Sequence, residues 1–141
     1  MEAMEGRFKK FESAYGTQDA AKRMMAVLDL GRQKDPETIP LLEKAAGDQS
    51  TAIRAHVARV IGEIGHQRGI PALRILLADK EQLVKADAIK AINSVARSLA
   101  ARPPKEIEGN KLAQALASSA HELPKKTAEG ILWLLEEAEK K

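Results

Sequence analysis

Two stretches of the chain repeat one pattern and decide the fold. Residues 39–64 read IPLLEKAAGDQSTAIRAHVARVIGEI, and residues 70–95 read IPALRILLADKEQLVKADAIKAINSV. Each begins with Ile-Pro-x-Leu, passes through a polar turn that contains Asp48 or Asp79, and continues as a longer run. In the longer runs the apolar residues recur every three or four positions, which is the spacing of one helical face. Each stretch is therefore predicted to be a hairpin of two helices.

The two stretches match position by position after a shift of 31 residues, from Ile39 to Ile70. Further equivalent pairs are Asp48 and Asp79, Ile53 and Val84, Arg54 and Lys85, Ala55 and Ala86, and Ile61 and Ile92. One shift thus aligns helix starts, turns and core positions together. Two-helix repeats of this kind are typical of a solenoid, in which stacked hairpins bury a face that neither can bury alone.

The repeated pattern resembles a known family. Ile-Pro-x-Leu, a turn aspartate, a following Arg or Lys, and Ile-Gly-Glu-Ile-Gly at residues 61–65 are similar to short HEAT-like repeats of the phycobilisome-lyase type. The resemblance covers residues 17–101 and implies an all-α fold, an α-solenoid (α-α superhelix) of two to three HEAT-like helical hairpins with flanking capping helices. The block that begins near Ala20 matches loosely, because Arg23 or Ala26 falls where a core aliphatic residue is expected.

The resemblance also implies a structural role for four charged residues. In this family an aspartate in the turn of a repeat pairs with a basic residue six positions later, and these pairs form a ladder between repeats. Asp48 with Arg54, and Asp79 with Lys85, have that spacing. We expect these four residues to be structural, and we expect the two aspartates to cap helices as well. The alternative is that they contact a binding partner.

The segments that flank the repeats are predicted to be helical caps within a single domain of residues 1–141. Residues 1–16 are the N-terminal cap and residues 104–141 the C-terminal cap, because a solenoid otherwise exposes apolar ends. Helices are expected at 106–121 and 124–140. An alternative is that the chain is a domain of a longer protein.

The large aromatic residues lie in these flanking segments. Phe8, Phe11 and Trp133 are expected in the capping core, with an exposed binding hot spot as the alternative.

The composition restricts the classes of function. The chain has 141 residues, a net charge of +3 and no cysteine, so disulfides, thiol catalysis and cysteine-ligated zinc are excluded. It contains no run of about 20 apolar residues and no signal-peptide pattern, and we therefore expect a cytoplasmic location. His56, His66 and His121 lack metal-ligand spacing. We expect a non-enzymatic protein without a metal or cofactor. The alternative is an enzyme, and it is suggested by analogy with chromophore-lyase subunits.

The candidate binding surface is the exposed side of the second helices, which line the concave surface in the resembled family. The predicted partner-binding residues are Arg59, Glu63, Lys90, Asn93 and Arg97. The small residues Ala55, Gly62 and Ala86 are expected to leave room for a partner helix. These features predict a protein–protein interaction or scaffold module that binds an acidic or amphipathic segment of another protein. An ordinary solvated helix face is the alternative.

A second functional hypothesis is binding of a nucleic-acid backbone on the same surface. Its basic strip consists of Arg54, Arg59, Lys85, Lys90 and Arg97. Glu63 and Asp87 interrupt this strip, and no aromatic residue is placed to stack on bases. Protein is therefore the preferred partner, and neither a membrane nor a small-molecule substrate is indicated.

Overall fold

The computed structural model describes residues 2–141, and side chains from residue 5 onward. In this range the chain forms α-helices and short 3₁₀ turns, with no strand. The α-helices are α1 (Glu2–Tyr15), α2 (Ala20–Gln33), α3 (Ile39–Ala45), α4 (Thr51–Ile64), α5 (Ile70–Leu77), α6 (Gln82–Ala100), α7 (Lys111–Ser119) and α8 (Ala128–Lys140). The 3₁₀ turns are η1 (Pro36–Thr38), η2 (Gln67–Gly69), η3 (Pro104–Ile107) and η4 (Leu123–Lys125).

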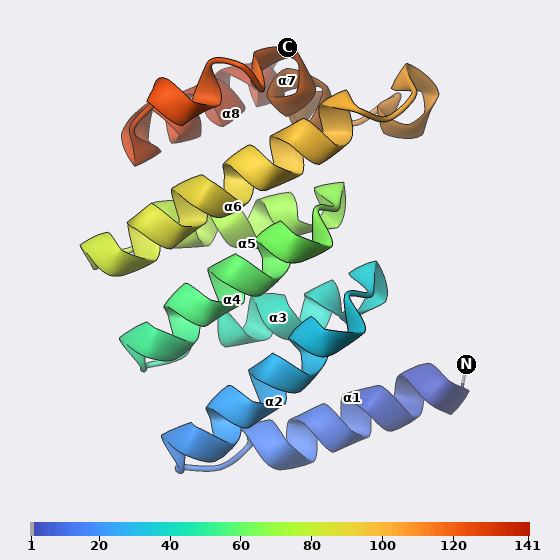
Figure 1. The fold of residues 1–141 in the computed structure, drawn as a ribbon, viewed down its shortest axis with the longest axis vertical. Coiled ribbons are helices and arrows are strands. Elements are labelled where there is room, and N and C mark those ends of the chain that lie inside the picture. The colour runs from blue at the N-terminus through green and yellow to red at the C-terminus, as the bar shows by residue number, and fades with distance from the viewer. Residues whose placement is uncertain (1) are drawn as a thin grey trace.

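The helices stack along the long axis of the molecule, from α1 at one end to α7 and α8 at the other (Figure 1). The short helices α3 and α5 pair with the longer α4 and α6. In Figure 1 the helices α2, α4 and α6 lie side by side on the near face, with α3 and α5 behind them. The predicted all-α solenoid of HEAT-like hairpins is thus confirmed.

Local chemistry explains the bounds of α4. The Ser50 hydroxyl accepts a hydrogen bond from the Ile53 amide, which satisfies one of the free donors of the first turn. The helix ends at Gly65, whose φ of 66° lies in the left-handed region that glycine adopts without steric cost. The longer helix of the hairpin predicted over residues 39–64 is therefore present, and its bounds are set by Ser50 and Gly65.

The buried hydrophobic residues form one connected cluster that runs from Phe11 in α1 to Leu135 in α8. Phe11 stacks on Tyr15 with ring centroids 5.0 Å apart, and Phe8 packs against the same cluster. Each hairpin thus adds a layer of aliphatic side chains to a shared interior, as expected for a solenoid.

Trp133 departs from its predicted place in a capping core. Its side chain is 64% exposed on α8. Ile131 and Leu135 are both fully buried, and a residue two positions from each of them points to the opposite side of a helix. The inward stripe of α8 therefore turns Trp133 outward.

The two C-terminal helices are shorter than predicted. Residues 104–107 form the 3₁₀ turn η3, and Gly109 follows with φ of 85°. The Asn110 side chain then caps α7 by accepting a hydrogen bond from the Ala113 amide. The Thr127 hydroxyl accepts from the Gly130 amide in the same way, so α8 begins at Ala128 rather than near Pro124. No helix in the described range is both long and apolar enough to cross a membrane.

Candidate partner-binding surface

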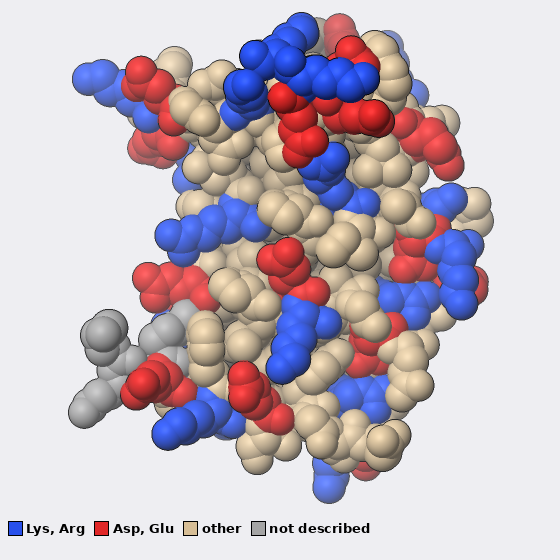
Figure 2. All heavy atoms as spheres, turned by 180° about the vertical axis from the view of Figure 1, so that it is seen from behind, with Lys and Arg blue, Asp and Glu red and all other residues tan. Residues whose placement is uncertain are grey.

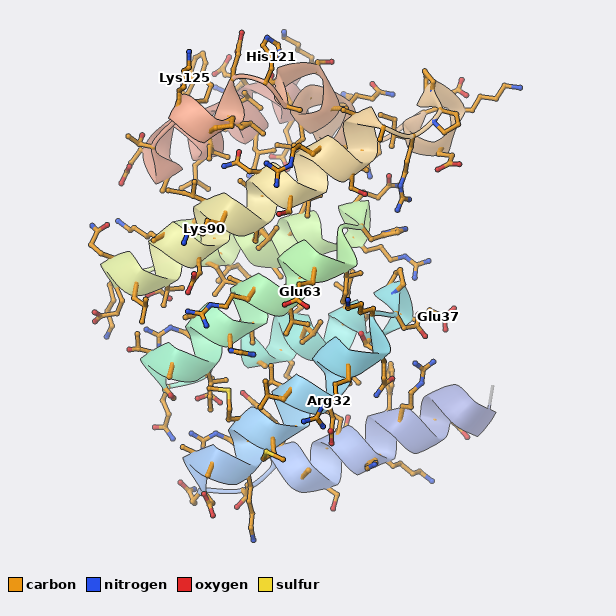
Figure 3. All side chains as sticks on the ribbon, in the orientation of Figure 1. Arg32, Glu37, Glu63, Lys90, His121 and Lys125 are labelled. Carbon is orange, nitrogen blue, oxygen red and sulfur yellow. The ribbon has the colours of Figure 1, made fainter. Side chains whose placement is uncertain are left out.

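The face formed by α2, α4 and α6 carries side chains from equivalent positions of successive repeats. One such row consists of Arg32, Glu63 and Ser94, which follow one another at intervals of 31 residues. Figure 3 shows Arg32, Glu63 and Lys90 on the face turned to the viewer, one from each of the three helices. All three of these labelled side chains are exposed. The solenoid therefore presents a surface on which neighbouring repeats contribute charged groups side by side.

A hollow of about 370 Å³ lies on this face between α4 and α6. It is lined by Arg59, Gly62, Glu63, Asp87, Lys90, Ala91 and Ser94. Three of the predicted partner-binding residues, Arg59, Glu63 and Lys90, thus surround one depression. The repeat equivalence of Arg59 and Lys90 places them in adjacent helices at the same level.

Arg59 is not a free cation within this hollow. Its guanidinium contacts the Asp87 carboxylate through both Nε and Nη2, each at 3.2 Å. The Asp87 side chain is only 8% exposed, whereas that of Arg59 is 53% exposed. A buried carboxylate requires a compensating charge, and Arg59 supplies it. Asp87, which sequence analysis treated as an interruption of a basic strip, is therefore the anchor of Arg59.

The small residues of the second helices serve helix packing rather than partner access. Ala55 and Gly62 are buried, in contrast to the expected open space, and Ala86 alone of the three is exposed. A Cβ atom added at Gly62 would lie 2.8 Å from the Cα atom of Ala91. The α4 and α6 backbones approach closely here, so the space is already filled by the neighbouring repeat.

The remaining two predicted residues lie outside the hollow. Arg97 is exposed near the end of α6. Asn93 is half-buried, and its Oδ1 atom is buried without a hydrogen-bond partner. Asn93 occupies the position equivalent to Gly62, but the helix that follows α6 in the stack is α7 and not a further repeat.

The aspartate–arginine ladder is present, but its partners differ from the predicted ones. Arg54 binds Asp79 of the next repeat, with Nε 2.8 Å from Oδ2 and Nη2 3.2 Å from Oδ1. It contacts Asp48 only at the backbone, where Nη1 donates to the carbonyl oxygen at 2.8 Å. Arg54 therefore joins the turns of two adjacent repeats, because the fork of the guanidinium can serve both at once.

Arg23 is the ladder residue of the preceding repeat. Sequence analysis had instead placed Arg23 at a position where a core aliphatic residue was expected. Its Nε lies 3.0 Å and its Nη2 3.3 Å from the two oxygens of Asp48, while Nη1 donates to the Thr17 carbonyl. The shift of 31 residues from Arg54 leads directly to Arg23, and this signal was available in the sequence. Arg23 is buried and tolerated there because its charge is paired.

Asp48 is the most heavily bonded carboxylate of the ladder. Besides Arg23, the Tyr15 hydroxyl donates to its Oδ2 at 2.5 Å and the Ser50 amide donates to its Oδ1 at 2.8 Å. Burial favours a higher pKa for Asp48, but the hydrogen bonds from Arg23 and Tyr15 outweigh it, so the pKa lies below its usual value. Burial and the bond to Asp48 both raise the pKa of Tyr15.

The ladder changes partner at Lys85. The predicted pair with Asp79 is not formed, because both oxygens of that carboxylate are held by Arg54. The Lys85 ammonium instead lies 3.6 Å from the Glu129 carboxylate of α8. Asp48 and Asp79 also do not cap α4 and α6 directly; each accepts the amide two residues later, from Ser50 and Glu81 respectively.

These contacts divide the basic strip predicted for nucleic acid. Arg54 is buried and paired, Arg59 is held by Asp87, and Lys85 lies beside Glu129. The exposed cations that remain are Lys90 and Arg97. On the opposite face, shown in Figure 2, acidic and basic side chains are interspersed along the stack and do not gather by sign. Nucleic-acid binders usually concentrate positive charge on one face.

Comparison with known proteins agrees with this architecture. A family model described as HEAT repeats matches residues 9–93, which includes α2 to α5 and most of α6. The match extends further toward the N-terminus than the predicted 17–101 region and does not distinguish the phycobilisome-lyase type. No curated protein matches the chain. HEAT repeats commonly serve as protein-interaction scaffolds and are generally non-enzymatic. The stacked hairpins, the ladder between their turns and the family match together show that this chain belongs to the HEAT repeat family.

Proposed function

We propose that this protein is a non-catalytic scaffold module that binds a segment of another protein across α2, α4 and α6. The observation that carries the proposal is the convergence of Arg59, Glu63 and Lys90 on the hollow between α4 and α6. Solenoids of this kind use extended faces of stacked helices to bind partners. A partner segment would here cross several repeats and contact the same position of each.

The chemistry of this face changes along the stack, and the change indicates an amphipathic segment. Leu28, Arg59 and Lys90 occupy equivalent positions, so one row passes from apolar to basic. Met25 is 53% exposed on α2, next to the half-buried Leu28 row. A segment with apolar side chains over α2 and carboxylates over α6 would match this gradient.

The acidic character of the partner rests on two cations of α6. Lys90 and Arg97 are exposed, and neither forms an ion pair with a described residue. Glu63 opposes them from α4. Partner carboxylates would therefore be placed over Lys90 and Arg97, where they gain attraction and keep away from Glu63.

Site-specific photo-crosslinking can test the surface. A crosslinking amino acid at Ser94, inside the hollow, should capture a defined partner from a lysate of the source organism. The same amino acid at Lys44, exposed on α3 behind this face, is the matched control and should not capture it. Capture from Lys44 with none from Ser94 would contradict the proposed surface.

Charge reversal then tests the residues. The variant carrying Lys90→Glu and Arg97→Glu should lose the captured partner and keep its melting temperature, because neither residue forms an ion pair with any of the described side chains. Arg59→Glu is a poor substitute, since it would leave the buried Asp87 carboxylate unpaired and destabilise the protein. Undiminished binding by the double variant would remove these two residues from the proposed site.

A cytoplasmic location also remains a prediction.

A further inference from the structure

Two turns of the stack lead from a longer helix into the next short one, and their capping residues differ. η1 precedes α3, and η2 precedes α5. The residue before η1 is Asp35, and its Oδ1 accepts a hydrogen bond from the Glu37 amide at 3.0 Å. The shift of 31 residues leads from Asp35 to His66, which stands before η2. The stack therefore has a histidine where the preceding repeat has an aspartate.

His66 fills the capping role with a ring nitrogen. Its Nδ1 accepts a hydrogen bond from the Arg68 amide at 3.0 Å, two residues further on, as Asp35 does for Glu37. An imidazole nitrogen accepts only while it carries no proton, so this bond requires the neutral ring with its proton on Nε2. Protonation turns Nδ1 into a donor, and the Arg68 amide then loses its acceptor. The cap of η2 thus exists in one protonation state only.

The surroundings of His66 oppose a positive charge on the ring. The residue is half-buried. Burial lowers the pKa of His66, and the nearby guanidinium groups of Arg102 and Arg68 lower it further. A protonated ring is therefore better accommodated when η2 opens, because the imidazolium then reaches water and moves away from the arginines.

The carboxylates of the adjoining segments do not supply a counter-ion for this ring. Each of three carboxylates is placed with an arginine: Asp35 lies 2.7 Å from Arg7 of α1, Glu106 of η3 lies 3.9 Å from Arg102, and Glu43 of α3 lines a hollow of about 400 Å³ together with Arg68. Glu63, one turn earlier on α4, is exposed and lines the hollow between α4 and α6. Among the described side chains, the histidine that lies beside a carboxylate is His121, not His66.

η2 is tightly seated in the fold, so the loss of its cap affects its neighbours. The Gly69 amide donates to the His66 carbonyl at 3.0 Å, and a Cβ atom added at Gly69 would collide with Ile61 of α4. Pro71, two residues after the turn, lines the hollow of about 400 Å³ that reaches Leu112 of α7. Opening of η2 would therefore loosen the entry to α5 and change the shape of this hollow.

From the equivalence of Asp35 and His66 and from the hydrogen bond at Nδ1, we propose that η2 is a pH-sensitive switch, closed when His66 is neutral and open when it is protonated. η1 is its internal reference. Hydrogen bonds from the Glu37 amide and from Arg7 lower the pKa of Asp35, so this carboxylate stays an acceptor throughout the range in which a histidine titrates. The switch is independent of the proposed partner surface, since no residue of η2 lines the hollow between α4 and α6.

The direction of the pH dependence follows from the two states of the turn. In the open turn His66 has the ordinary histidine pKa of about 6.5, whereas in the closed turn its pKa is lower. Below about pH 6.5, opening therefore takes up one proton. Linkage then increases the open population about tenfold per pH unit, until the pH reaches the lower pKa of the closed turn. Above about pH 7 the open population should be independent of pH.

Nuclear magnetic resonance of the full chain tests both the bond and its loss. At about pH 7.5 the ring nitrogen shifts of His66 should identify Nδ1 as the unprotonated nitrogen. Hydrogen-exchange protection of the Arg68 amide, corrected for the intrinsic rate, should fall toward about pH 5 by up to about tenfold per pH unit. Protection of the Glu37 amide should not fall. A protonated Nδ1 at neutral pH, or an Arg68 amide that stays protected at about pH 5, would overturn the proposal.

Variants separate the switch from general acid sensitivity. His66→Asn supplies an acceptor that does not titrate, and should keep the Arg68 amide protected at both pH values. His66→Ala removes the acceptor and should leave this amide unprotected at both. His121→Gln removes a histidine whose side chain is 79% exposed, and should behave as the parent.

Circular dichroism melting curves show which of these variants fold. If His66→Ala does not fold, the comparison of the parent with His66→Asn decides alone. Equal loss of Arg68 protection in the parent and in folded His66→Asn would show that the imidazole does not control η2. Loss of the pH dependence in His121→Gln would likewise contradict the assignment to His66.

Discussion

Arg54 and Asp79 join two successive repeats through two hydrogen bonds of 2.8 Å and 3.2 Å, although the residues lie 25 positions apart. A third hydrogen bond from the same guanidinium holds the Asp48 carbonyl of its own repeat. Arg23 and Asp48 repeat the arrangement one layer earlier. The solenoid therefore has a polar connection between its turns in addition to its aliphatic core.

Removal of the ladder arginine should strongly destabilise the stack. Arg54→Ala leaves the largely buried Asp79 carboxylate without its counter-ion, and we expect a loss of about 3 kcal/mol in the free energy of unfolding. Arg32→Ala, which removes an exposed pair with Asp29, should cost at most about 1 kcal/mol. Urea denaturation measures both. Equal effects of the two substitutions would show that the ladder does not carry stability.

The ladder also predicts how stability depends on pH. Burial would raise the pKa of Asp79, but hydrogen bonds from Arg54 and the Glu81 amide lower it below its usual value. A carboxyl group with a depressed folded-state pKa stabilises the fold above its unfolded-state pKa of about 3.9. This contribution disappears as the pH falls through the lower folded-state pKa. The free energy of unfolding should therefore drop below about pH 4.

Asp79→Asn isolates that effect from other acid-sensitive groups. The variant should be less stable than the parent at neutral pH, and the difference between the two should shrink toward low pH. His56 and His66, whose pKa values are lowered mainly by burial, also destabilise the fold on acidification, but they do so in both proteins. A difference in stability that stays constant with pH would argue against the ionised Asp79.

Close contact between α4 and α6 should make Gly62 intolerant of any side chain. Gly62→Ala would bring a Cβ atom to 2.8 Å from the Ala91 Cα, and a backbone cannot yield as a flexible side chain does. We expect a loss of about 1–3 kcal/mol, the usual cost of overpacking. Gly6→Ala in α1 meets no atom within 4 Å and should stabilise by up to about 1 kcal/mol through helix propensity. Thermal melts of the two variants should therefore shift in opposite directions.

The C-terminal helices should be required for a stack that folds cooperatively and does not aggregate. Deletion of residues 104–141 uncovers the side of α6 that packs on α7, and it removes the Glu129 partner of Lys85. We expect the truncated chain to bind a hydrophobic dye and to aggregate, because solenoid ends need a cover. A monomeric truncation with a cooperative melt would contradict the capping role proposed for this segment.

Nucleic-acid binding should be weak or absent. With Arg54, Arg59 and Lys85 engaged inside the protein, Lys90 and Arg97 are left to contact phosphates on this face. Two contacts would give a log–log salt dependence of about −1.8 on duplex DNA, whereas the full strip of five would give about −4.5. Fluorescence anisotropy with a labelled duplex at several salt concentrations separates the two cases, and the steeper slope would favour the nucleic-acid function over the scaffold.

The fold was largely predictable because its determinants are local and repeated. Ile39 to Ile64 and Ile70 to Val95 each contain a complete hairpin, with its proline start, its polar turn and its helical stripe. The shift that relates them was enough to predict stacking. The same shift leads to Arg23, and its role could have been inferred by giving the repeat more weight than the expectation of an aliphatic residue.

The candidate site was less predictable because it depends on contacts between repeats. A helical wheel placed Ala55 and Gly62 on the outer side of α4, yet both are buried by the neighbouring helix. It likewise could not show that Arg59 reaches Asp87, or that Asp79 accepts Arg54 instead of Lys85. Each of these outcomes depends on the distance between two helices.

The sequence by itself therefore determined the two hairpins and the order in which they stack, since each hairpin follows from residues within one repeat. Tertiary structure alone decided which charges are free to bind a partner. The reason is physical: hydrogen bonds and ion pairs form between atoms about 3 Å apart, and only the packing of one repeat on the next sets those distances.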